Sequence, residues 1–452
     1  MEIEELEREV VIIGSGAAGL VSAAIMTNHI DPEHIMVVSS HPPPYGGSTP
    51  LASLGLAASL HDDEGDTIEL FQYDMVKLGA DSDAAKLVAY YSRVLVLWLE
   101  SLGLRWTRRL DGRISQRSVV GHSVPRIIRV GDSTGRAIVE VLTSRLLGLN
   151  VEFRPYLIAA RMLVENPNRR VIVTLVDYLH EKIVVVEADT VVIASGGYAA
   201  IIPGSPSPNQ YGVVCLTALL DAGFRLADID EVVWWPVVLP EGEPDPVQLN
   251  LVSSKATPYQ RIEKAQQVFL PIASLGGVLT DANYGLVKGK LYAVGEVAAS
   301  KLGKAYSIPG MSLLEALASP LIAFKDYKPL GRSKANSKNN LKKAALNLLS
   351  ELNSRGDLKP YEIIDTIRGI LMELFIQNDG LHPTALHVLR AIYSKGLDTA
   401  NAPLEDSLLS LSLAKFLSAL IATKLARVKG SCTLGGYKAW RVGDRVLVSS
   451  QD

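Results

Sequence analysis

Three glycines near the start of the chain have the spacing of a phosphate-binding turn. Gly14, Gly16 and Gly19 follow an apolar run at 10–13 and precede a run of small and apolar residues at 20–28. That order predicts a strand, a tight turn and a helix whose N-terminal backbone N–H groups attract a pyrophosphate. Gly14 would allow the turn, Gly16 would let phosphates approach the backbone, and Gly19 would let the helix pack on the strand. We therefore predict a dinucleotide site, with an ordinary glycine-rich turn as the alternative.

The elements around this turn have the order of a βαβ unit. A second strand is expected at 35–39, at the distance from the first that a parallel crossover needs. The acidic residue that often binds a ribose at this point is absent, and Ser39 and Ser40 stand there instead, with hydroxyls that make weaker bonds. A buried strand at 190–197 ends in a glycine pair, which brings backbone close to a ligand. The same pattern predicts further helices at 84–102, 133–147 and 312–323, and strands at 151–153, 171–176, 183–186 and 290–294.

Composition indicates a folded protein of two or three domains. The chain has 452 residues, and its net charge of -3 creates no field for nucleic acid or an anionic membrane. Cys215 and Cys432 lie far apart, so neither a disulfide framework nor a metal site is indicated. No uncharged run is long enough to span a bilayer, and the acidic start is not typical of a signal peptide. We expect a cytoplasmic protein.

Changes in composition along the chain predict its organisation. Residues 236–257 are rich in Pro, Glu and Asp and are expected to form a loop. The stretch 325–343 is basic and polar, which favours a solvated linker, with a docking surface for an acidic partner as the alternative. Amphipathic helices are expected after it, at 341–352, 361–375, 385–394 and 408–428.

Several further segments carry a resemblance to a known family. They are Gly14–Gly19, Gly46–Gly55, Gly121–Arg126, Asp132–Arg136, Ala194–Gly197, Tyr292–Glu296 and Ser312–Glu315. In this order the chain resembles the flavoprotein family of L-aspartate oxidases, soluble fumarate reductases and succinate dehydrogenase flavoprotein subunits, and within it most the archaeal L-aspartate oxidases. The resemblance implies an α/β fold: a Rossmann-like FAD-binding domain of the glutathione-reductase type, a much reduced capping insertion and a C-terminal helical domain. The expected boundaries are 1–235 and 271–324 for the FAD-binding domain, 236–270 for the insertion, 325–344 for the linker and 345–452 for the helical domain.

The resemblance implies FAD as the cofactor. It would place Ser15–Ala18 at the pyrophosphate, Ser48–Gly55 around the flavin, Glu296 at a ribityl or ribose hydroxyl, and the backbone of Ser312 and Leu313 at the ring. Ser48 stands where the dehydrogenase subunits carry a histidine bonded to the flavin, so non-covalent binding is expected. The predicted cofactor-binding residues are Gly14, Ser15, Gly16, Ala17, Ala18, Gly19, Ser39, Ser40, Gly47, Ser48, Thr49, Ala52, Gly55, Ala194, Gly196, Glu296, Ser312 and Leu313.

The resemblance also implies removal of hydrogen from an amino or dicarboxylic acid, as when L-aspartate becomes iminoaspartate for NAD synthesis. Here the sequence departs from the family. Two expected histidines are replaced by Trp235 and Ile272, an arginine by Ser307, and a glutamate by Val119. Between Arg225 and Arg332 the only arginine is Arg261. A clamp for two carboxylates therefore cannot be rebuilt from this part of the chain.

His122 and Arg126 are the remaining catalytic candidates. His122 would be a substrate ligand or proton carrier, and Arg126 a carboxylate anchor; in the alternative, the segment braces the flavin domain and Arg126 pairs with an acid such as Asp132. Trp234 and Trp235 could stack on a ligand or fill the core. Two hypotheses follow: an FAD-dependent oxidoreductase of the L-aspartate oxidase type, or an FAD-binding protein without that activity. The second would act as a subunit, structural partner or homo-oligomer.

Overall fold

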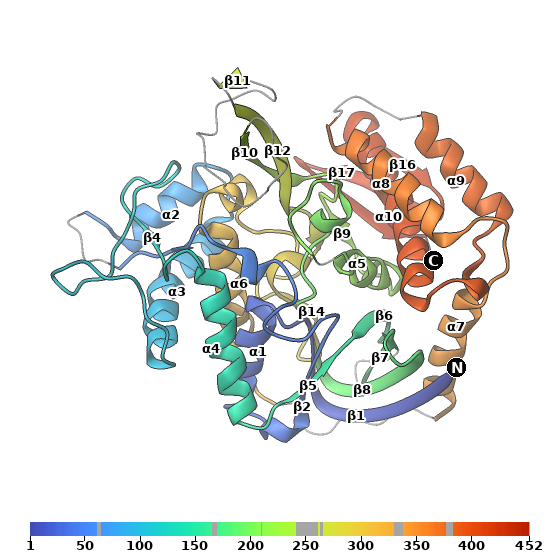
Figure 1. The fold of residues 1–452 in the computed structure, drawn as a ribbon, viewed down its shortest axis with the longest axis horizontal. Helices are drawn as coiled ribbons and strands as arrows, with labels where there is room; N and C mark the ends of the chain where they lie inside the picture. Colours follow the sequence, from blue (N-terminus) through green and yellow to red (C-terminus); the bar gives the residue numbers. More distant parts are fainter. Residues whose placement is uncertain are drawn as a thin grey trace.

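The structure is a computed structural model, and it describes residues 1–60, 65–164, 170–208, 210–240, 261–262, 265–329, 338–376 and 383–451. Its centre is an eight-stranded sheet with the order β14-β15-β8-β1-β2-β5, to which β6 and β7 are added beside β8. Helices cover the sheet, and the C-terminal helices gather on one side of the molecule (Figure 1). The α/β class and the FAD-domain architecture expected from the sequence are confirmed.

The parallel strands of this sheet bring their carboxyl ends to one edge. β1 pairs with β2 and β8, β15 with β8, and β2 with β5, all in parallel. In register, Ile13 lies beside Val38 and Ile193, and Ile193 lies beside Ala293. Ligands bind at such an edge in open α/β sheets. The strand bounds are β1 (Glu2–Ile13), β2 (Ile35–Ser39), β5 (Glu152–Pro155), β8 (Lys182–Ile193), β14 (Gly285–Val287) and β15 (Leu291–Ala293).

Small and apolar residues place the helices against this sheet. All but two residues of α1 (Ala17–Met26) are buried, and it packs against α4 (Thr134–Gly148) and α6 (Met311–Phe324). The meander of β6 (Leu157–Leu163) and β7 (Val171–Asp177) packs against α5 (Gly212–Asp221). Also present are α2 (Ile68–Val76), α3 (Ser82–Ser101) and the strand pair β3 (Leu56–Ala57) and β4 (Ile127–Ile128).

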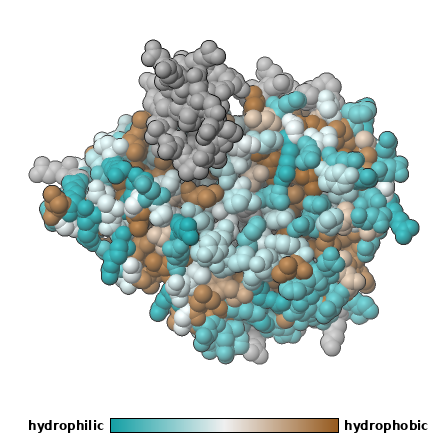
Figure 2. All heavy atoms as spheres, viewed as in Figure 1, coloured by the Kyte–Doolittle hydropathy of each residue, from teal (hydrophilic) through white to brown (hydrophobic). Residues whose placement is uncertain are grey.

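The four predicted C-terminal helices are present, and α10 packs against α5 and α8. Their bounds are α7 (Lys338–Leu352), α8 (Pro360–Ile376), α9 (Pro383–Lys395) and α10 (Leu404–Lys429). Among the described residues α10 alone is long and apolar enough to cross a bilayer, but 78% of its apolar window is buried inside the protein. Burial explains that apolar length, as expected of a core helix. Where the surface is visible in Figure 2, hydrophilic and hydrophobic residues are interspersed.

The C-terminal region is not wholly helical, which corrects the sequence prediction. Its last described residues form β16 (Ser431–Leu434), β17 (Tyr437–Val442) and β18 (Arg445–Ser450). They join a five-stranded sheet with the order β13-β9-β18-β17-β16, in which β9 (Leu226–Ala227) and β13 (Gly277–Val278) come from the segments predicted to form the FAD-binding domain. The linker also ends earlier than expected, because α7 already begins at Lys338.

The segment predicted as a loop begins as a strand. β10 (Val232–Pro240) pairs antiparallel with β12 (Ala265–Ser274), and β11 (Arg261–Ile262) adds to β12. The predicted boundaries at 236 and 270 therefore fall inside strands, while 241–260 lie outside the described residues. The strands expected at 183–186 and 190–197 are likewise joined in one strand, β8, which ends at Ile193, so the glycine pair lies in the turn after it.

Candidate functional site

A cavity of about 660 Å³ opens at the carboxyl edge of the parallel strands. This volume lies within the range of roughly 300–1,000 Å³ typical of small-molecule sites. The turns after β1, β2, β8 and β15 all contribute to it, as does the start of α6. The antiparallel strand pair of β10 and β12, called the hairpin β10–β12 below, also contributes. The sheet thus delivers distant parts of the sequence to one site.

The glycine turn forms one wall of this cavity through contacts that exclude larger residues. Gly14 has a φ of 118°, and a Cβ there would lie 2.1 Å from the carbonyl oxygen of Ala194. A Cβ at Gly19 would lie 1.9 Å from the carbonyl oxygen of Gly14. Gly16 begins α1 without a side-chain cap, and the first turn of that helix has no acidic residue. The open helix N-terminus is suited to an anionic phosphate.

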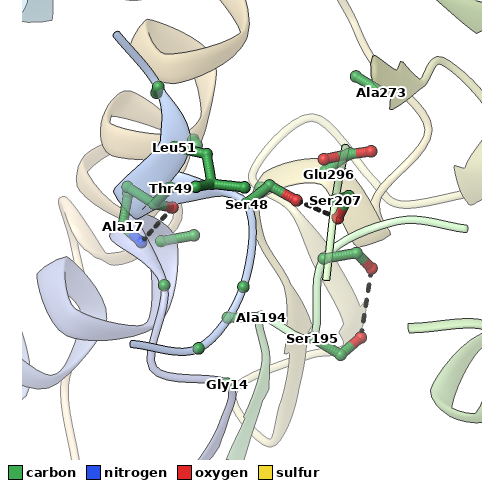
Figure 3. A pocket seen from close by; sticks show the side chains of 18 of the residues that line it. Gly14, Ala17, Ser48, Thr49, Leu51, Ala194, Ser195, Ser207, Ala273 and Glu296 are labelled. Atoms are coloured by element: carbon green, nitrogen blue, oxygen red, sulfur yellow. Dashed lines mark hydrogen bonds between the residues drawn. The ribbon is translucent and has the colours of Figure 1, made fainter. Parts of the chain in front are cut away.

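The segment 48–55 lies directly against the glycine turn. The Oγ1 atom of Thr49 accepts a hydrogen bond of 3.1 Å from the Ala17 N–H, and the hydroxyls of Ser48 and Ser207 lie 2.6 Å apart (Figure 3). A Cβ at Gly135 would lie 1.9 Å from the carbonyl oxygen of Thr49, so α4 holds this segment in place. The contacts put Ser48 and Thr49 in the cavity wall.

Ser39 and Ser40 line the cavity where the sequence predicted weak ribose bonds. The Ser39 hydroxyl donates to the carbonyl oxygen of His41 at 2.7 Å, and the Ser40 hydroxyl lies 3.0 Å from Nδ1 of His41. The carbonyl oxygen of Ser40 accepts a bond from the Tyr178 hydroxyl. Since both serine hydroxyls are engaged locally, a ribose would use their remaining acceptor positions.

Glu296 is held at the edge of the cavity by Ser274. Its Oε1 atom accepts bonds from the backbone N–H of Ser274 at 2.7 Å and from the Ser274 hydroxyl at 2.9 Å. Burial raises the pKa of Glu296, against the effect of these two bonds. A Cβ at Gly197 would lie 1.8 Å from the Ser274 hydroxyl oxygen, which explains why glycine follows β8 here. The carboxyl group is therefore fixed in one orientation.

All predicted cofactor-binding residues except Gly19 line the cavity, and Gly19 packs α1 against the turn behind it. Their individual contacts to a cofactor stay predictions. The sequence did not point to the lining residues Leu157, Ile158, Ala159, Pro206, Ser207, Tyr211, Cys215, Leu270 and Tyr306. Most of these residues belong to no sequence motif that could have identified them. Tyr211 belongs to an aromatic group: its ring stacks on that of Tyr178, with the ring centroids 6.1 Å apart.

Arg126 is not among the described residues that line the cavity, and its expected role as a carboxylate anchor stays a prediction. The side chain is fully buried and pairs with Asp66 at 3.0 Å and with Asp74 at 2.6 Å. Asp132, the partner suggested from the sequence, pairs with Arg129 instead. Burial alone would raise the pKa of Asp74, but bonds from Lys77, Ser123 and Arg126 hold it below its usual range. The guanidinium is thus the centre of an internal ion-pair network.

His122 also lies outside the cavity lining. Its Nε2 atom is 3.1 Å from the carbonyl oxygen of Pro309, just before the start of α6. Burial lowers the pKa of His122 to about 4, against the effect of this bond. The ring is therefore neutral at pH 7, and its Nε2–H donates to Pro309. His122 thus braces the segment that leads to Ser312, and its role as a substrate ligand or proton carrier stays a prediction.

Comparison with known proteins identifies similar chains. Residues 9–255 match the model of a family described as FAD binding domain. An L-aspartate oxidase of Mesorhizobium japonicum is 32% identical over 238 residues, which are 51% of this chain and 44% of that protein. A fumarate reductase flavoprotein subunit of Mycobacterium tuberculosis is 27% identical over 237 residues, 52% of this chain and 40% of that protein. The matches thus span less than half the length of these curated relatives.

Solved structures share the fold over almost the whole chain. A chain of E. coli quinol fumarate reductase FrdA superposes with a TM-score of 0.77 at 17% identity, covering 99% of this chain and 97% of that one. Sdh1 of Mycobacterium smegmatis superposes with a TM-score of 0.74 at 19% identity, covering 93% and 87%. At these identities the likeness concerns the fold alone.

Proposed function

This chain belongs to the FAD binding domain family and binds FAD, and from this premise we propose that it holds the flavin non-covalently and transfers hydride to or from a small organic molecule. The observation that carries the proposal is that the glycine turn, Glu296 and the start of α6 all line one and the same cavity. We also propose a cytoplasmic location.

Bound FAD would supply the hydride acceptor. The N-terminus of α1 would hold the pyrophosphate, Glu296 a hydroxyl of the linking chain, and the backbone of Ser312 and Leu313 the ring. The remaining task of the protein is to hold a substrate carbon against the flavin and exclude water. Residues of the hairpin β10–β12 that line the same cavity are placed for that task.

The names of several relatives suggest oxidation of L-aspartate to iminoaspartate as one specific reaction to test. Such a substrate needs cationic side chains for its carboxylates. Among the described residues no Lys, Arg or His lines the cavity. Of the cations in the part of the sequence between β10 and β12, the side chains of Lys255, Arg261 and Lys264 lie outside the described part.

A second candidate is an FAD-binding protein that serves as a subunit of an assembly. Two observations favour it: several relatives are named as flavoprotein subunits, and both catalytic candidates are engaged away from the cavity. The partner would be another protein chain or a second copy of this one.

Anaerobic reduction of the bound flavin separates the two candidates. Purified protein with stoichiometric FAD is mixed with L-aspartate, succinate and a panel of amino acids, and flavin absorbance is followed. Bleaching by one of them supports the oxidoreductase and identifies its substrate. If dithionite bleaches the flavin and none of these compounds does, oxidation of an amino or dicarboxylic acid is refuted. Absence of bound FAD after reconstitution would refute both candidates.

A further inference from the structure

The hairpin β10–β12 presents four apolar residues to the cavity. Trp235 and Leu270 are cross-strand partners, so their side chains lie on the same face of the hairpin, and both line the cavity together with Ile272 and Ala273. In Figure 3, Ala273 lies beyond Glu296, on the far side from Gly14. The hairpin therefore borders the end of the cavity away from the phosphate-binding turn.

An irregularity in the strand pairing adds Ile272 to this wall. The register shifts between Val233, which pairs with Ala273, and Trp234, which pairs with Pro271. Ile272 is left without a partner, which is the pattern of a β-bulge. Bulges re-aim a side chain and often occur beside binding sites. Here the bulge lets Ile272 and Ala273, neighbours in sequence, both line the cavity.

The charges around the cavity do not suit an anionic substrate. Glu296 is the one Asp, Glu, Lys, Arg or His side chain among the described lining residues, and it is an acid. Two other described cations are engaged away from the cavity: Arg126 pairs with Asp66 and Asp74, and the Lys301 ammonium donates to Thr280 and to the carbonyl oxygen of Asp281. A carboxylate buried beside this wall would lose its hydration without gaining a counter-ion from the described lining residues.

An apolar ligand, in contrast, gains free energy of binding here, because burial of its surface against Trp235, Leu270 and Ile272 is favourable. Resting on the proposed function, we propose that the substrate bound beside the hairpin is an uncharged, largely apolar molecule and not a dicarboxylate. The hairpin residues Trp235, Leu270 and Ile272 would determine this specificity. The flavin site is kept unchanged under this proposal, and only the class of molecule presented to it differs.

Two ligands that differ in one ionised group test the proposal without turnover. Coumarin is neutral and flat, and coumarin-3-carboxylate adds a single carboxylate to the same ring. Titration calorimetry on the FAD-loaded protein is expected to give a dissociation constant at least about tenfold lower for coumarin, equivalent to about 1.4 kcal/mol. Equal or tighter binding of the carboxylate overturns the proposal, and so does failure of coumarin to bind. FAD content is measured separately, so loss of the cofactor, which would refute the proposed function, is distinguishable from either result.

Neighbouring tryptophans provide a matched pair of variants. Trp235→Phe trims a side chain that lines the cavity and is expected to weaken coumarin binding about threefold. Trp234→Phe makes the same change on the opposite face of the hairpin and should leave binding unchanged. Equal effects of the two variants would contradict the assignment of the wall to Trp235.

A positive charge introduced into the wall should shift the ligand preference from the neutral coumarin toward its carboxylate. Ile272→Lys places a cation at the bulge and is expected to shift the preference toward coumarin-3-carboxylate by about tenfold. FAD content and the melting temperature are compared with the unsubstituted protein. If Ile272→Lys retains FAD and the preference for coumarin is unchanged, Ile272 does not face the ligand and the proposal fails.

Discussion

At the glycine-turn end of the cavity, backbone atoms approach one another so closely that only glycine fits, whereas at the hairpin end the wall consists of side chains on two strands. A Cβ at Gly19 would collide with the carbonyl oxygen of Gly14, while Trp235, Leu270 and Ile272 contribute only their surfaces. A backbone-built site tolerates few substitutions, but a side-chain wall can change its chemistry while the sheet stays intact. This difference explains how a cofactor motif can be kept while the residues at the other end of the cavity change.

The largest expected effect concerns the backbone-built end. Gly19→Ala forces a Cβ to within 1.9 Å of a backbone oxygen and should destabilise the protein by about 5 kcal/mol or abolish folding, with loss of bound FAD. Gly148→Ala is the control, because that helical glycine has nothing within 4 Å of its Cβ position. Thermal unfolding and released flavin measure both variants. A stable, FAD-loaded Gly19→Ala protein would show that the glycine-turn end tolerates substitution as well as the side-chain wall does.

The next largest effect concerns Arg126. Arg126→Gln removes the guanidinium from the buried Asp66 and Asp74, although Asp74 keeps its pair with Lys77, and should lower the free energy of unfolding by about 3–5 kcal/mol. Arg129→Gln removes an ion pair with the exposed Asp132 and should change the free energy of unfolding by less than about 1 kcal/mol. Urea unfolding measures both. A stable Arg126→Gln protein that retains FAD but has lost flavin reduction would restore the role of substrate anchor.

An effect of intermediate size on stability is expected when the pH is lowered. Because the pKa of His122 is about 4 in the folded protein and 6.5 as the reference, the unfolded state binds a proton first as the pH falls. The free energy of unfolding is therefore unaffected by His122 above pH 6.5 and decreases as the pH falls toward 4, by about 3 kcal/mol. His122→Gln keeps an N–H donor for Pro309 and should flatten this part of the pH profile. An unchanged profile would show that His122 titrates normally.

The smallest effect tests whether side chains also matter near the cofactor. Ser274→Ala removes one of two bonds to Glu296 and should weaken FAD binding about fivefold, equivalent to about 1 kcal/mol. Ser274→Thr restores the hydroxyl and should recover most of the affinity. Flavin release on dilution measures the change. If Ser274→Ala binds FAD normally, the orientation of Glu296 depends on the backbone alone.

The cofactor end of the site could be predicted from the sequence because its requirements are local. Gly14, Gly16 and Gly19 stand within six residues, between a strand and a helix that their own composition predicts. The same holds for α3, α4 and α6, whose spacing of apolar residues predicted them to within a few positions. Each of these features depends on neighbours in the sequence.

The remaining features depend on contacts between distant residues. Arg126 pairs with Asp66 and Asp74 because α2 and the segment before it lie beside β4, and nothing in the sequence distinguishes these acids from Asp132. The segment 236–240 contains two prolines and looks like a loop, but β12 supplies its strand partners. The bulge at Ile272 likewise arises from pairing and has no signature in the residues themselves.

The five-stranded sheet has a consequence for the order of folding. β9 forms its ladder with β18, and the backbone N–H of Val446 also bonds to the side chain of Asp228, 218 residues earlier in the chain. During synthesis, β9 emerges from the ribosome long before β18 and meanwhile has an unpaired edge. Such edges invite pairing with other chains. We therefore expect nascent or C-terminally shortened chains to depend on chaperones for protection, even though the flavin-binding turn is made before either strand.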